Sequence, residues 1–197
     1  MARHYVLYED SRAAGPGGKK FPLHELIVAL VADRRPNVHR WSLSASFEPI
    51  PKSGIDNLLS ALQNDVPDLA GAGGRVFAVV DGDRVTEHVR RRGIAVANAA
   101  PPEEAVATFI AGLSHAALIQ VVVLHDNLES VLRAYEKPCA PLHALTPTLL
   151  KEAIAHKDRI ARDRMLVEAA RNSELRKCLE TAVPSLATIA DALAAVA

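Results

Sequence analysis

The sequence has few aromatic residues, two cysteines and no excess of charge of either sign. Aromatic residues make up 4% of its 197 residues, and 23 Lys and Arg residues balance 23 Asp and Glu residues. The formal net charge is therefore zero, which disfavours a protein held to nucleic acid by bulk positive charge, so any such contact must be local. With 49% hydrophobic residues, the chain has the composition of a globular protein of slightly more than one typical domain.

The cysteines and the apolar runs exclude further classes of protein. Cys139 and Cys178 have no Cys-x-x-Cys or Cys/His spacing around them. They therefore indicate neither a disulfide framework nor a zinc site, and we expect both to be reduced and partly buried. No apolar run approaches the ~18 to 20 residues of a membrane span, and the first residues lack the apolar run of a signal peptide. We expect a soluble, cytoplasmic protein.

Several nucleotide-binding and hydrolase motifs are also missing. Gly18-Lys19 lacks the rest of a phosphate-binding loop, because Ala13 stands where the first glycine belongs and Lys20 where the Ser or Thr belongs. The glycines of residues 71–74 precede a predicted strand, whereas a dinucleotide-binding fingerprint follows one. The chain has no Gly-x-Ser-x-Gly element, so a serine hydrolase has no support.

Short apolar runs alternate with helical periodicity along the first two thirds of the chain. The runs predict strands over 4–8, 38–47, 75–80 and 118–124, with the third at the centre of the sheet because it is almost continuously apolar. Pro49 and Pro51 are expected to end the second strand, and Ser53 to cap the helix that follows it. We therefore predict an α/β fold with a central, mainly parallel sheet flanked by helices, and an all-helical C-terminal third.

This pattern divides the chain into two parts. Residues 1–140 are expected to form the α/β domain, and residues 141–197 a helical extension packed on it. In the extension, breaks between helices are expected near Asn172 and at Pro184, since Asn favours helix caps and Pro the first helical turn.

Acidic residues follow three of the predicted strands. Glu9 and Asp10 follow the first, Asp81 and Asp83 the third, and Asp126 and Glu129 the last. Because ligands bind at the carboxyl ends of parallel strands, these groups are expected to converge on one edge of the sheet. Carboxylates gathered in this way suit a divalent cation such as magnesium or manganese. Alternatively, acidic residues occur there because they favour helix starts.

The order of these motifs resembles that of the TOPRIM domain. A glutamate ends the first strand, Asp81-Gly82-Asp83 ends a buried strand, and residues 123–129 join a strand to an acidic helix start. The chain is most similar to small stand-alone proteins related to the OLD-type nucleases of bacterial defence. Asp10 stands where the family usually has glycine, and no ATPase, zinc-ribbon or topoisomerase segment is found. The resemblance implies a TOPRIM-like fold for the α/β domain.

The resemblance also implies a site and a substrate. Glu9, Asp81 and Asp83 would be catalytic, and with Glu129 they would bind Mg or Mn for hydrolysis of phosphodiester bonds in DNA or RNA, which implies a nuclease with a role in bacterial defence. Local basic residues could contact the nucleic-acid backbone: Arg84, Arg90, Arg91, Lys151, Lys157 and Arg159. Alternatively, the C-terminal group of these residues is a solvated helix face, since Asp158 and Asp163 are interleaved with the basic residues there.

Two other functions fit the same sequence. A TOPRIM-like scaffold without turnover would act as a binding or regulatory protein through a partner or as a homodimer, with the helical tail as an oligomerisation surface. The apolar stripe of the last helix is, however, more typical of intramolecular core than of an interface. An ordinary flavodoxin-like α/β domain would show no dependence on a metal. The sequence alone does not separate these alternatives from the nuclease.

Overall fold

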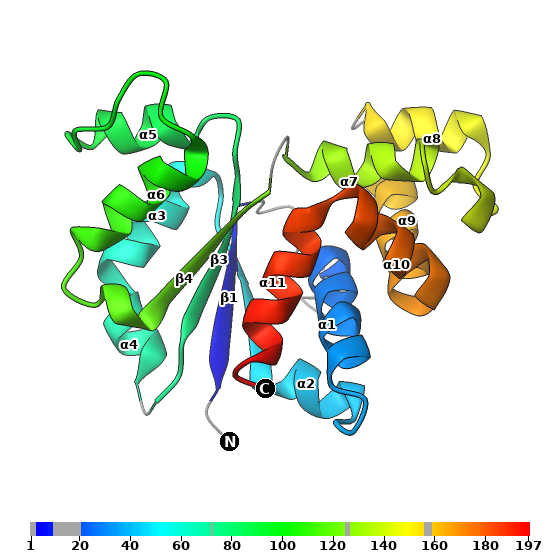
Figure 1. Ribbon diagram of the computed structural model, residues 1–197, viewed down its shortest axis with the longest axis horizontal. Coiled ribbons are helices and arrows are strands. Elements are labelled where there is room, and N and C mark those ends of the chain that lie inside the picture. Colours follow the sequence, from blue (N-terminus) through cyan, green and yellow to red (C-terminus); the bar gives the residue numbers. More distant parts are fainter. Residues whose placement is uncertain (1–2, 10–20, 72, 125–126, 156–158) are drawn as a thin grey trace.

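The protein has the predicted α/β fold, built on a four-stranded parallel sheet (Figure 1). The computed structural model describes residues 3–9, 21–71, 73–124, 127–155 and 159–197. The strands lie in the order β2-β1-β3-β4, and each neighbouring pair is parallel. Their bounds are β1 His4–Tyr8, β2 Phe47–Pro51, β3 Val76–Asp81 and β4 Ile119–Leu124.

Helices lie on both sides of the sheet (Figure 1). On one side are α3 (Ile55–Asn64), α4 (Val66–Ala70), α5 (Val85–Arg91) and α6 (Pro102–Ala111). On the other side are α1 (Pro22–Arg34), α2 (Arg40–Ser46), α7 (Asn127–Glu136), α8 (Pro147–Ile154), α9 (Arg159–Arg171), α10 (Ser173–Ala182) and α11 (Pro184–Ala194). Two short 3-10 turns, Ala116–Leu118 and Ala140–Leu142, complete the described elements. No helix in these described ranges is long and apolar enough to cross a membrane.

The position of β3 inside the sheet explains why its sequence is almost continuously apolar. Successive side chains of a strand point to opposite faces, and both faces of β3 are covered. Phe77 and Val79 join the core formed with α1 and α11, whereas Ala78 and Val80 join the core formed with α3 and α6. The two cores therefore meet at the sheet, with β3 inside it, as predicted.

The predicted second strand is wrong in its position. Residues 40–46 form α2, and the strand β2 begins at Phe47 and includes both Pro49 and Pro51. The prolines are tolerated because β2 is an edge strand that pairs with β1 alone, so that a proline can turn its missing N–H away from the ladder. Ser53 does not cap α3 either: the residue before that helix is Gly54, whose φ of 89° lies in a region that glycine adopts easily.

The all-helical C-terminal part is packed against α1. Its α9 and α11 share a buried core with α1, and the buried Arg176 of α10 forms a bidentate ion pair with Asp33 near the end of α1. The predicted breaks are confirmed, because Asn172 caps α10 through its side-chain oxygen and Pro184 begins α11. Paired and hydrogen-bonded, the Arg176 guanidinium can be buried without a large penalty.

The expectation of two reduced cysteines is wrong, since Cys139 and Cys178 form a disulfide. Cys139 follows α7, and Cys178 lies within α10, which packs against α7. Their Cα atoms are 5.9 Å apart, within the usual range for a disulfide. Tertiary packing of α10 on α7 brings the two residues together, and no local spacing in the sequence signals it.

We predict that reduction of this disulfide lowers the free energy of unfolding. The bond closes a loop with a sequence separation of 39 residues. Its loss should cost about 4 kcal/mol, because the unfolded chain regains the entropy that the loop removes. Urea denaturation with and without dithiothreitol measures the difference, and a Cys139→Ala/Cys178→Ala variant, which cannot respond to the reductant, is the control. Equal stability of the oxidised and reduced protein would contradict the prediction.

Candidate functional site

The strand order creates a topological switch point at the carboxyl ends of β1 and β3, which we call the crevice. From β1 the chain runs to β2 through α1 and α2 on one face of the sheet, and from β3 it runs to β4 through α5 and α6 on the opposite face. The direction of winding therefore reverses between β1 and β3. In open parallel sheets, ligands bind outside the carboxyl ends of the strands at such a reversal.

Glu9 and Asp81 meet at this crevice. Glu9 directly follows β1, Asp81 is the last residue of β3, and both are partly buried. The Glu9 Oε2 atom accepts a hydrogen bond from the Asp81 backbone N–H at 3.1 Å. A hydrogen bond to a charged acceptor is stronger than one between neutral groups, so it holds the Glu9 carboxylate against the tip of β3.

Asp83 lies in the turn that joins β3 to α5, where its side chain is exposed. The turn is fixed by Gly82, whose N–H donates to the carbonyl oxygen of Leu124 at the end of β4. A Cβ atom at Gly82 would lie 3.0 Å from the Val123 side chain and 3.2 Å from the Leu124 oxygen. The glycine between the two aspartates therefore allows the turn to approach β4 closely.

Glu129 lies in the first turn of α7, the helix that follows β4. Its Oε2 atom is 3.3 Å from the Arg133 guanidinium, one helical turn further along. Exposed ion pairs of this spacing contribute little free energy, so a stronger interaction could replace this one. The other two acidic residues of the predicted edge, Asp10 and Asp126, lie outside the described residues.

The chemistry of these groups suits a divalent cation, although their arrangement is incomplete. Oxygen ligands from carboxylates are what magnesium and manganese prefer. Within the described ranges, however, no group of three Asp, Glu, His or Cys side chains is placed to hold a metal ion. Glu9 and Asp81 thus provide a pair of adjacent acidic residues, without a third from the part of the chain that the structure describes.

A buried Tyr–His pair supports this edge of the sheet, and no pattern in the sequence signals it. The Tyr8 hydroxyl lies 2.8 Å from His24 Nδ1, and His24 Nε2 lies 3.2 Å from the Phe47 carbonyl oxygen. Because a carbonyl can only accept, Nε2 carries the proton and Nδ1 accepts from the hydroxyl. Burial lowers the pKa of His24 to about 4 and raises that of Tyr8, so both groups are neutral.

The predicted nucleic-acid-binding residues do not form a single surface of free cations. Arg90 donates to the carbonyl oxygens of Val96 and Ala97, and Arg91 pairs with Glu87. Arg84 and Lys151 are exposed, on α5's N-terminal side and on α8 respectively. Arg159 begins α9, and Lys157 lies outside the described residues.

We predict that His24 makes the stability of the protein depend on pH. Its folded-state pKa is lowered from 6.5 to about 4 by burial, so its contribution is complete above pH 6.5 and is lost as the pH falls through 4. The loss should amount to about 3 kcal/mol. Urea denaturation at a series of pH values should show a smaller acid loss for His24→Gln than for the wild type. Parallel pH profiles would contradict a neutral, buried His24.

Comparisons with known proteins found similarity at the level of structure. No family model and no curated protein matches the chain. A solved structure of the C-terminal region of the OLD protein of Xanthomonas campestris pv. campestris aligns with a TM-score of 0.42 and 16% identity, over 98% of this chain and 95% of that one. A second structure of the same region aligns with a TM-score of 0.37 and 14% identity, over 99% and 98%. The similarity extends over nearly the whole chain at low sequence identity.

Proposed function

We propose that this protein is a metal-dependent hydrolase of phosphodiester bonds in nucleic acid, with its centre at the crevice between β1 and β3. The observation that carries the proposal is the hydrogen bond from the Asp81 N–H to Glu9 Oε2, 3.1 Å long. It joins the two motifs, a glutamate after one strand and Asp-x-Asp after another, at the place where the fold favours a ligand. The same order of motifs underlies the resemblance to the TOPRIM domain.

Each acidic residue has a distinct position in the proposed site. Asp81 and Glu9 would hold the cation at the crevice, with Asp83 supplied by the turn after β3 and Glu129 by the first turn of α7. When bound, magnesium or manganese polarises the phosphoryl oxygen and activates water. The chain itself fixes the direction of the Glu9 carboxylate through the Asp81 N–H, and it fixes the turn that carries Asp83 through Gly82.

A specific observation favours the alternative of a non-catalytic binding protein. The described residues bring only Glu9 and Asp81 into contact, and Arg90 and Arg91 are bound to other groups of the chain. A scaffold that binds a partner needs neither a complete metal site nor free arginines. Metal-dependent cleavage therefore separates the two functions.

We predict that purified protein cleaves DNA or RNA only when magnesium or manganese is present, and that Asp81→Ala abolishes cleavage. The variant keeps the backbone N–H that donates to Glu9 Oε2, and it removes one acidic group from a sheet edge where like charges disfavour each other when no metal is bound. Its melting temperature in EDTA should therefore equal or exceed that of the wild type. Gel-based cleavage assays and thermal unfolding measure the two effects.

The matched control is Asp68→Ala, which removes an exposed aspartate from α4 on one side of the sheet. It should leave cleavage intact. Absence of cleavage of all substrates by the wild type, together with a lower melting temperature for Asp81→Ala, would favour the binding protein.

A further prediction concerns the ligand from α7. Glu129→Gln should weaken the binding of magnesium or manganese more than Asp126→Asn does, because the resemblance to the TOPRIM domain implies Glu129, and not Asp126, as the ligand, and a neutral amide is a poorer ligand than a carboxylate. Arg133→Gln should strengthen it, since the arginine then no longer competes for the Glu129 carboxylate. Isothermal titration with each metal gives the three affinities. Equal effects of Glu129→Gln and Asp126→Asn would remove Glu129 from the site.

A further inference from the structure

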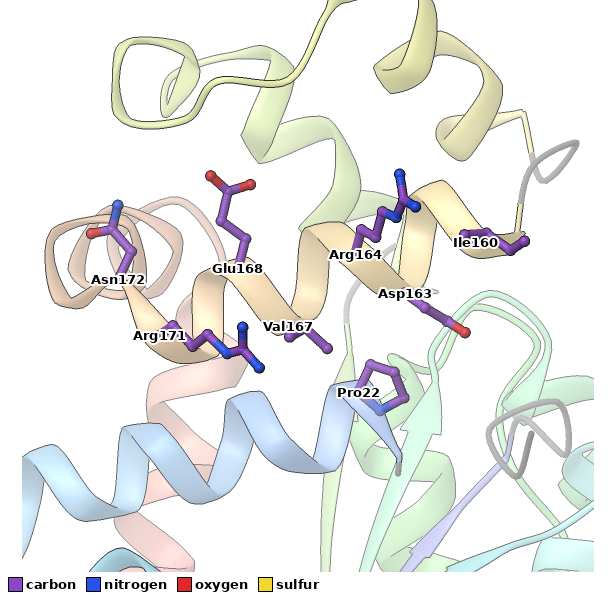
Figure 2. Close-up of a pocket in the computed structure, with 8 residues that line it drawn as sticks. All are labelled: Pro22, Ile160, Asp163, Arg164, Val167, Glu168, Arg171 and Asn172. Atoms are coloured by element: carbon purple, nitrogen blue, oxygen red, sulfur yellow. The ribbon is translucent and has the colours of Figure 1, made fainter. Parts of the chain in front are cut away.

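A groove lies between α9 and the first turn of α1, with a volume of about 700 Å³ (Figure 2). One wall is formed by side chains of α9, including Arg164, Val167 and Arg171, and the other includes Pro22 of α1. None of these residues is among the basic residues named from the sequence, although Arg164 follows the last of them, Arg159, by five positions. Arg164 and Arg171 lie on the same helix, and the packing of α9 against α1 places Pro22 beside them.

Two arginines that line the groove, Arg164 and Arg171, could bind an anion. Neither Arg164 nor Arg171 makes an ion pair or a hydrogen bond through its side chain with any residue in the part of the chain that the structure describes, and both are exposed. They are seven residues apart on one helix, which separates their Cα atoms by about 10 Å. Arg40 lies near the Arg171 end of the groove, where its guanidinium donates to the carbonyl oxygen of Ala170.

The same groove has an apolar surface. Ile160 is 67% exposed at one end, and Val167 and Pro22 face the space between the helices (Figure 2). An occupant that covers Ile160 would remove apolar area from water, which is favourable. Single-stranded nucleic acid offers both complementary features, phosphates for the arginines and unpaired bases for the apolar side chains. A duplex offers the phosphates but keeps its bases stacked inside.

The groove adjoins the acidic crevice. Pro22 follows Phe21, whose ring packs on the ring of Tyr8 with the centroids 4.2 Å apart. Tyr8 is the last residue of β1 and directly precedes Glu9. The part of the groove beside Pro22 therefore lies near the strand end that carries the Glu9 carboxylate.

Two carboxylates, those of Asp163 and Glu168, also line the groove. Neutralising one of them should change the affinity for an anion in the opposite direction to neutralising an arginine. Asp163 lies 3.8 Å from the Nε atom of Arg162, so part of its charge is offset. Glu168 is on the same wall as Arg164, and it would repel a phosphate held there (Figure 2).

We propose, on the basis of the proposed function, that this groove binds single-stranded nucleic acid and directs it to the crevice at Glu9 and Asp81. Arg164 and Arg171 contact the phosphates, and Ile160 and Val167 contact the bases. The substrate of the proposed hydrolase is accordingly a single strand or the unpaired end of a duplex.

The test is binding of a fluorescein-labelled oligothymidylate to the full chain in EDTA, measured by fluorescence anisotropy over a range of salt concentrations. Arg164→Gln and Arg171→Gln should each weaken binding and reduce the slope of log affinity against log salt by about 0.7. Glu168→Gln should strengthen binding. Ile160→Ser should weaken binding without changing the slope. Lys177→Gln, which removes an exposed cation of α10 outside the groove, should have a smaller effect than either arginine variant.

Four outcomes would overturn the proposal. The first is that the wild type does not bind the oligothymidylate, and the second is that Arg171→Gln lowers the affinity no more than Lys177→Gln does. The third is that Glu168→Gln weakens binding, and the fourth is that the two arginine variants lose as much affinity for a duplex as for a single strand. Because EDTA removes the cation, these results do not depend on cleavage. Binding through the groove without magnesium-dependent cleavage would contradict the proposed hydrolase alone. Cleavage of a single strand that is unchanged by Arg164→Gln and Arg171→Gln would contradict the groove alone.

Discussion

The parallel pairing of β1 with β3 is the constraint on which the candidate site depends. Tyr8 pairs with Val79, so β1 ends two residues short of Asp81, and Glu9 can reach across to the tip of β3. An antiparallel pairing would put the carboxyl end of β1 beside the start of β3, far from Asp81. The helices that follow β1 and the helices that follow β3 cover opposite faces of the sheet. The edge at the carboxyl ends of these two strands is therefore open to a ligand.

The sequence predicted the parts of the fold that depend on continuous patterns. β3 was readable because both of its faces are buried, and α1 because its apolar stripe repeats at helical spacing. The segment 38–47 was misread because its own residues do not decide between helix and strand. Pairing with β1 places the strand over Pro49 and Pro51, and that pairing is a tertiary effect. The disulfide was missed for the same reason, since packing of α10 on α7 brings its two halves together.

The candidate site shows a similar division. That acidic residues gather at one edge follows from the position of strand ends, and Glu9 and Asp81 do lie together. The side-chain partners of Arg90 and Arg91 depend on loop conformation and on neighbouring residues, so charge counting could not predict them. The buried hydrogen bonds of His24 could not be predicted either, because nothing in the sequence around this histidine indicates that Tyr8 and Phe47 will contact it.

The Cys139–Cys178 disulfide also determines how the helical part responds to a protease. The bond encloses α8, α9 and the first half of α10 within a covalent loop. A single cut anywhere inside that loop leaves both pieces attached to each other, including the segment that ends in α11. The groove wall formed by α9 would thus stay covalently tethered to the rest of the molecule after nicking, and the two pieces could separate only once the disulfide is reduced.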